Sequence, residues 1–110
     1  MSNATDGQRM AHTVFFTLTD NSDAACEQLL AGCKKYLTDH PGTIFFAAGR
    51  RAVDYVRPVN DQEFDVSLHL VFENRAAHDA YQVAPRHDEF IAELKSNWKQ
   101  VRVFDALLAD

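Results

Sequence analysis

The sequence predicts an α+β fold in which strands and helices follow one another in the order β-α-β-β-α-β. Two observations lead to this prediction. Apolar residues alternate with polar ones in 12–20 and 64–73, and they recur every three or four residues in 22–38 and 74–98. A chain of 110 residues can bury one hydrophobic core but not two. We therefore expect a single domain over residues 12–108, preceded by a disordered leader over residues 1–11.

The first half of the chain supplies a strand, a helix and a second strand. Residues 12–20 have strand composition, and their alternate side chains share one face. Ser22 is a candidate N-cap for a helix that the apolar spacing extends to Thr38. The motif "DHPG" ends this helix. Residues 43–56 then predict the second strand, with a bulge or bend at Gly49.

The second half supplies a strand, a broken helical region and a last strand. Residues 64–73 alternate most clearly, with one apolar and one mainly polar face. Asn74 can cap a short helix. Pro85 suits the first turn of a further helix, because the N–H that proline lacks has no partner there. This helix is expected to reach Trp98, and residues 99–107 form the last strand.

This order of elements is that of the ferredoxin-like unit, an antiparallel four-stranded sheet with helices on one face only. The other face is left open in a monomer. We expect it to carry Ser67 and His69 together with Phe15 and Phe45. A mixed polar and aromatic open face predicts that two copies pair, sheet against sheet, as a homodimer.

Charge and hydropathy exclude several classes of partner. The net charge is −5, and the only local basic cluster is "GRR" at Gly49–Arg51, so we expect no nucleic-acid binding. The longest early uncharged run, Met10–Thr19, is far shorter than the roughly 18 residues of a membrane helix. With no signal-peptide pattern, a cytoplasmic location is expected.

Cys26 and Cys33 are too far apart along one helix for a disulfide and are expected in the core.

The helix break at Pro85 directs several side chains toward one space. His87 lies three residues before Phe90, in the inward stripe of its helix, and Tyr81 is on the inward side of the preceding helix. His12 is on the strand face that points under the helices. These side chains are expected to meet in an otherwise apolar pocket between sheet and helices. The candidate substrate-binding residues are His12, Val66, Leu68 and Phe90.

Over Ala11–Leu107 the sequence resembles the stress-responsive A/B barrel (Dabb) family. The shared features are "HTVFFTL" with its opening histidine, "PG" before the second strand, "FDVSLHLVFE", "YQVAPRH" and "FDAL". The family pattern at the turn is Tyr, two residues, His-Pro, one residue, His. Tyr81, Pro85 and His87 match it, whereas Ala84 replaces the first histidine. The resemblance implies that two protomers form a dimeric α/β barrel.

The resemblance also implies a chemistry. One branch of the family, the plant polyketide cyclases, closes a ring by aldol condensation and uses the tyrosine and the final histidine of this turn. Carried over, His87 is the general base, Tyr81 hydrogen-bonds the enolate or the base, and His12 is a pocket residue. A histidine can accept a proton from carbon beside a carbonyl near neutral pH, and a phenol can stabilise the oxyanion. The implied activity on a small carbonyl compound is cofactor-independent and of cyclase, isomerase or lyase type.

Tyr81 and His87 allow a second interpretation. In it the protein is a non-catalytic dimeric stress-response or interaction module, and the two residues satisfy each other's polar atoms at the helix break. An empty cavity of a few hundred cubic ångströms favours a ligand, whereas a filled one favours the module.

The sequence predicts no metal site and no cofactor. His12, His69 and His87 come from different elements, and no short motif focuses them on one ion. His69 is expected at the dimer contact, and His40 and His78 are expected at the surface.

Overall fold

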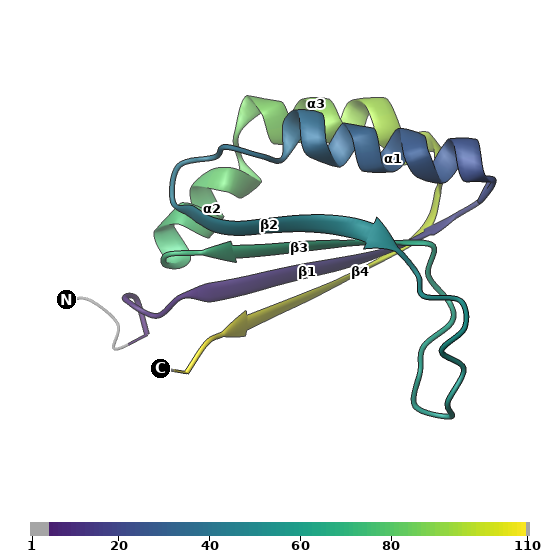
Figure 1. Cartoon of the computed structure of the whole chain (residues 1–110). Coiled ribbons are helices and arrows are strands. Elements are labelled where there is room, and N and C mark those ends of the chain that lie inside the picture. The colour runs from purple at the N-terminus through teal and green to yellow at the C-terminus, as the bar shows by residue number, and fades with distance from the viewer. Residues whose placement is uncertain (1–4, 110) are drawn as a thin grey trace.

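An antiparallel sheet forms one layer of the molecule, and helices cover one face of it (Figure 1). The structure is a computed structural model that describes residues 5–109. The strands lie in the order β2-β3-β1-β4. They are β1 (Met10–Leu18), β2 (Thr43–Arg50), β3 (Val66–Phe72) and β4 (Trp98–Leu107). The helices are α1 (Asp23–Tyr36), α2 (Arg75–Gln82) and α3 (Pro85–Leu94), with a 3-10 turn at Lys95–Asn97. The predicted ferredoxin-like fold is confirmed.

The predicted helix starts are also confirmed. The Ser22 side chain accepts a hydrogen bond from the Ala25 N–H at the start of α1, and Asn74 accepts one from the Ala77 N–H at the start of α2. Pro85 occupies the first turn of α3. Each of the two side-chain caps accepts a hydrogen bond from a backbone N–H that has no partner within the helix, and proline has no such N–H.

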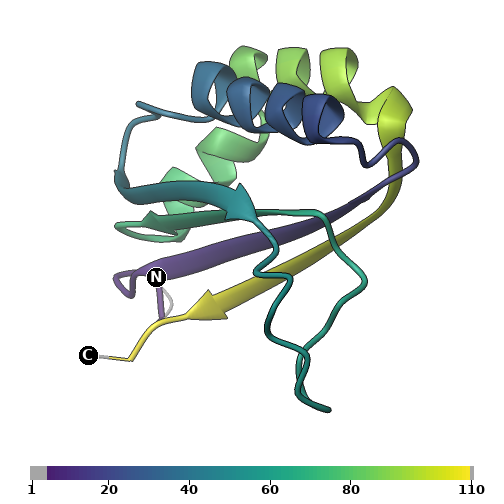
Figure 2. The ribbon, with the colours of Figure 1, turned by 45° about the vertical axis from the view of Figure 1, so that its right-hand side comes forward.

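The second strand is shorter than predicted. β2 ends at Arg50, which pairs with Val66 at the start of β3. One further backbone hydrogen bond, from the Arg51 N–H to the Asp65 carbonyl, follows before the two segments separate. Residues 51–65 instead form a loop that extends away from the helices, below the sheet (Figures 1 and 2). The register shift lies between Thr43 and Phe45, and Gly49 pairs regularly with Ser67. The predicted irregularity at Gly49 is therefore wrong.

Two other boundaries differ from the prediction. α3 ends at Leu94, and Trp98 is the first residue of β4 although its ring still packs against Phe16. β1 begins at Met10, so Met10 and Ala11 of the expected leader belong to a strand. Residues 1–4 of that leader lie outside the described residues.

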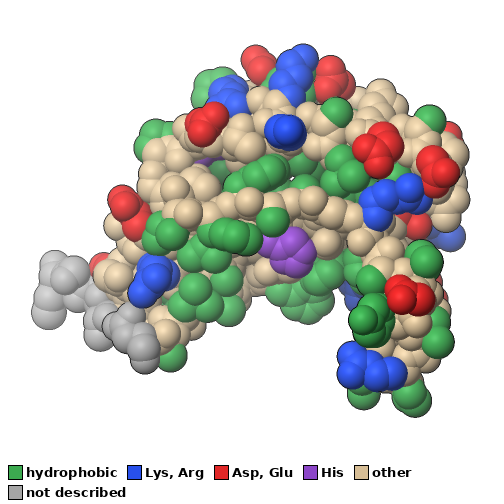
Figure 3. All heavy atoms as spheres, in the orientation of Figure 1, with side chains coloured by type: hydrophobic (Ala, Val, Ile, Leu, Met, Phe, Trp, Pro, Cys, Tyr) green, Lys and Arg blue, Asp and Glu red, His purple; other side chains and the backbone are tan. Residues whose placement is uncertain are grey.

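Alternation along the strands separates a buried face from an open face. The core contains inward residues of β1 and β3 together with Cys26 and Cys33, which are free thiols. On the open face, the Phe15 ring lies 4.8 Å from Phe64 and 5.7 Å from Phe104. Hydrophobic side chains gather along this underside of the sheet (Figure 3). Among the described residues, no helix is both long and apolar enough to cross a membrane.

Candidate active-site cavity

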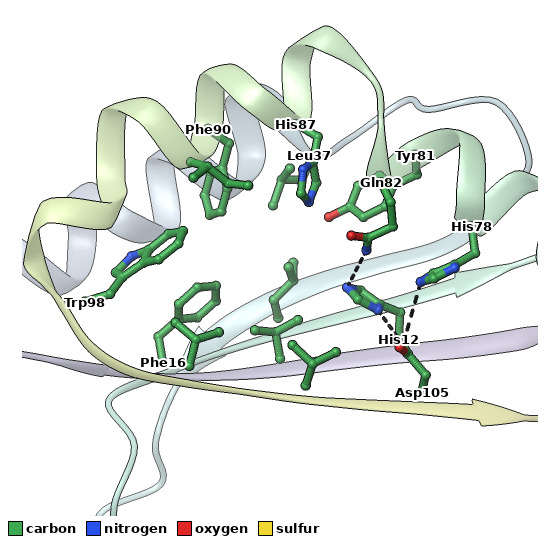
Figure 4. Close-up of a pocket in the computed structure, with 15 residues that line it drawn as sticks. His12, Phe16, Leu37, His78, Tyr81, Gln82, His87, Phe90, Trp98 and Asp105 are labelled. Atoms are coloured by element: carbon green, nitrogen blue, oxygen red, sulfur yellow. Dashed lines mark hydrogen bonds and ion pairs between the residues drawn. The ribbon is translucent and has the colours of Figure 1, made fainter.

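A cavity of about 340 Å³ lies between the helices and the inward face of β1 and β4 (Figure 4). Val101 and Val103 of the edge strand β4 line it, and they are 39% and 50% exposed. The cavity therefore opens to solvent along β4. Its volume falls within the range of small-molecule sites.

The two ends of the cavity differ in chemistry. Polar side chains gather at the end under α2, and Figure 4 shows imidazole, phenol, amide and carboxylate groups converging there. They are His12, His78, Tyr81, Gln82, His87 and Asp105. Aromatic and aliphatic side chains gather at the other end. They include Phe16, Phe90, Ile91 and Trp98. This division suits a ligand with one polar and one apolar part.

Tyr81 and His87 meet across the helix break, but they do not hydrogen-bond each other. Their ring centroids are 4.9 Å apart in an edge-to-face arrangement. The His87 Nδ1 atom is buried and has no hydrogen-bond partner. The described residues offer no partner to the Tyr81 hydroxyl either. Because the two polar groups do not pair, the interpretation that they satisfy each other is weakened.

Burial sets the protonation states of this pair. It lowers the pKa of His87 below the usual value for histidine; Asp88 partly opposes this effect, and His12, His40 and His78 add smaller lowering effects. It raises the pKa of Tyr81 well above its usual value. At neutral pH the imidazole is therefore mainly neutral and can accept a proton, while the phenol keeps its proton and can donate a hydrogen bond.

His12 is held by residues from both layers. Its Nδ1 atom lies 2.5 Å from the Asp105 carboxylate on β4, and its Nε2 atom lies 3.4 Å from the Gln82 amide on α2. Desolvation lowers the pKa of His12, and Asp105 partly opposes this effect. The contacts fix the plane of the imidazole at the polar end of the cavity.

The structure brings most of the candidate residues to this cavity. His12, Leu68, Tyr81, His87 and Phe90 all line it. One correction concerns Val66, which points to the same side of the sheet but is fully buried in the core and does not line the cavity.

The expected surface positions of His40 and His78 are wrong. His40 is buried, and its Nε2 atom lies 2.7 Å from the Tyr36 carbonyl. His78 is buried and lines the cavity. Its place three residues before Tyr81 on the same helix was a signal for this, because residues i and i+3 share a helix face. His69, unlike His78, lies on the open face of the sheet, where its Nε2 atom is 3.0 Å from the Ser67 hydroxyl.

Asp105 was not singled out by the sequence pattern. It lies opposite His12 in the β1–β4 pairing, and it follows the cavity-lining Val101 and Val103 at steps of two residues. Once β4 is paired with β1, this alternation places the carboxylate on the cavity side.

Fold and cavity together define a ferredoxin-like α+β domain with a small-molecule-sized site between sheet and helices. The chain belongs to the stress-responsive A/B barrel (Dabb) family, whose model matches residues 10–107. No curated protein matches the sequence.

Several solved structures share the fold. A dimeric ferredoxin-like protein of unknown function from Thermobifida fusca has a TM-score of 0.77 at 17% identity, covering 93% of this chain and 92% of its own. A Dabb family protein from Mesorhizobium loti has a TM-score of 0.76 at 23% identity, with coverages of 94% and 99%. A hydroxynitrile lyase from Passiflora edulis has a TM-score of 0.74 at 18% identity, with coverages of 94% and 96%. These similarities establish the fold.

The unpaired hydroxyl of Tyr81 leads to a stability prediction. Tyr81→Phe should change the free energy of unfolding by less than about 0.5 kcal/mol, because no hydrogen bond is lost. His40→Leu should lower it by about 1–3 kcal/mol, because the Tyr36 carbonyl loses its partner. Chemical denaturation of both variants tests this. A loss in Tyr81→Phe as large as that in His40→Leu would show that the hydroxyl has a structural role.

Proposed function

We propose that this protein binds a small carbonyl compound in the cavity and removes a proton from the carbon beside the carbonyl. The observation that carries the proposal is that Tyr81 and His87 lie together at one end of a cavity of about 340 Å³, where neither the Tyr81 hydroxyl nor the buried His87 Nδ1 has a hydrogen-bond partner among the described residues. Burying such groups without partners costs free energy, and a ligand that pairs with them recovers that cost.

The His87 imidazole is the general base. It is mainly neutral at neutral pH, and the residue lines the cavity. The proton of the substrate C–H bond moves to a ring nitrogen of His87, and the electron pair of that bond becomes part of the enolate. Such proton transfer by a positioned side chain accelerates reactions by about 10²–10⁴-fold.

The Tyr81 hydroxyl stabilises the enolate oxygen. Its raised pKa keeps the phenol protonated, so that it donates a hydrogen bond to the developing negative charge. The enolate then reacts at carbon or is reprotonated, which corresponds to cyclase, isomerase or lyase chemistry. A protein of the same fold is described as a hydroxynitrile lyase, which is consistent with lyase chemistry as one of these alternatives.

The apolar end of the cavity selects the rest of the substrate. Phe90, Ile91 and Trp98 line it, and the edge between Val101 and Val103 gives access from solvent. A substrate with its carbonyl near Tyr81 would place an alkyl or aryl group against these side chains.

Deuterium exchange tests the proton transfer without knowledge of the natural reaction. Wild-type protein in D₂O, incubated with acetophenone and a series of aliphatic methyl ketones, should incorporate deuterium beside the carbonyl faster than buffer does. His87→Ala and Tyr81→Phe should each lower this rate by about 100-fold or more. Glu89→Gln, on the exposed side of the same helix as His87, should leave it unchanged. NMR follows the loss of the C–H signal.

Two results of this experiment would contradict the proposal. One is exchange at the buffer rate for every ketone. The other is exchange that His87→Ala catalyses as fast as the wild type, since the base would then lie elsewhere.

We also propose that the protein is a homodimer joined through the open face of the sheet. Phe45 and Phe104 on this face are 52% and 53% exposed, and they extend an aromatic surface around Phe15 and Phe64. Related structures are described as dimeric. A two-fold pairing covers the same surface on both copies.

Sedimentation velocity of one variant tests this interface. Phe104→Glu should weaken the dimer by at least about tenfold, which corresponds to roughly 1.4 kcal/mol, because it would bury a carboxylate in the interface. Val83→Glu changes another exposed apolar residue, at the end of α2, and should leave the dimer intact. A monomeric wild type, or equal dimer affinities in both variants, would rule out this interface.

A further inference from the structure

Three potential metal ligands from three different elements converge at the polar end of the cavity. They are His12 on β1, His78 on α2 and Asp105 on β4, and one ligand atom from each lies within 4.8 Å of the other two. Figure 4 shows the two imidazoles on either side of the carboxylate. Both histidines are buried, at 4% and 8% exposure.

The His78 imidazole has an unused nitrogen directed at this cluster. Its Nδ1 atom lies 3.0 Å from the Asp79 carboxylate, which can only accept a hydrogen bond; in the neutral imidazole with its proton on Nδ1, the Nε2 atom carries the lone pair. This Nε2 atom is buried without a hydrogen-bond partner, and it lies 3.7 Å from the Asp105 carboxylate, too far for a hydrogen bond. Histidines that bind metals usually donate their other ring N–H to a carboxylate, as His78 does to Asp79.

We propose that His12, His78 and Asp105 bind a divalent transition-metal ion, with Zn²⁺ the ion that best suits the set. Two imidazole nitrogens and one carboxylate oxygen are ligands that Zn²⁺ accepts in sites that keep a fourth position open. All three residues line the cavity, so a fourth ligand could reach the ion from the cavity. His12, His69 and His87 were the potential ligands considered from the sequence. His69 cannot contribute to this site, because it lies on the opposite face of the sheet.

Binding requires small shifts of the ligands and a change of tautomer at His12. With metal–ligand bonds of about 2.0–2.1 Å, ligand atoms in a tetrahedral site lie roughly 3.3 Å apart. His12 and Asp105 must therefore separate slightly, and His78 must approach. The proton that His12 Nδ1 shares with Asp105 moves to Nε2, so that Nδ1 can bind the ion. The Gln82 amide oxygen can accept a hydrogen bond from the new Nε2–H after the amide flips.

The metal site is independent of the proposed proton transfer. Its ligands do not include Tyr81 or His87, and metal binding is measured without any substrate. Loss of the proposed activity would therefore leave the metal site intact, and absence of a metal would leave the exchange chemistry to be tested separately.

Titration with ZnCl₂ and CoCl₂ tests the site on the full chain without an affinity tag. Calorimetry should give one Zn²⁺ per chain, and Co²⁺ should give the visible absorption of a four-coordinate N/O site. Zn²⁺ should also raise the unfolding temperature of the wild type, because the assembled site binds it more tightly than the unfolded chain does. His78→Ala and Asp105→Asn should each weaken Zn²⁺ binding by at least about tenfold.

Asp54→Asn is the matched control. It removes one carboxylate from the exposed loop, away from the cavity, and should bind Zn²⁺ as the wild type does. Asp105 is only partly buried, and circular dichroism of the metal-free Asp105→Asn protein will verify that it folds. The proposal fails if the wild type binds neither ion, or if His78→Ala and Asp105→Asn both bind Zn²⁺ as tightly as Asp54→Asn.

Discussion

The alternation of side chains along the central strand β1 is the constraint on which the rest of the structure depends. β1 pairs with β3 on one side and β4 on the other, so it sets the register of both neighbours. His12 points toward the helices and Phe15 points to the open face. A shift of one residue in this register would exchange the two faces. The same pairing brings Asp105 opposite His12 and thereby creates the polar end of the cavity.

The helix break supplies the second half of the site. Proline at the start of α3 interrupts what would otherwise be one helix, and the two segments aim Tyr81 and His87 at one space. Ala84 stands where the family pattern has a histidine, yet His78 brings another imidazole into the cavity from α2. The chain therefore departs from the family pattern at Ala84, while the cavity keeps an imidazole from His78.

Local patterns in the sequence predict the order of elements, the helix caps and the positions of Tyr81 and His87, because these depend on neighbours within a few residues. They do not predict where β2 ends, since Val53, Tyr55 and Val56 have strand composition but no strand to pair with. They also miss the contribution of Asp105. Its contact with His12 joins residues far apart in the chain and depends on the β1–β4 register.

We propose that Tyr81 and His87 face a ligand in the cavity of a dimeric protein. Native mass spectrometry of freshly purified, tag-free protein tests it most directly, before and after incubation with methyl ketones and beside His87→Ala. We expect a dimer that carries a small organic molecule, and we expect a smaller fraction of the His87→Ala dimer to carry it. A monomer, a dimer that stays free of ligand in every sample, or a ligand retained equally by His87→Ala would contradict it.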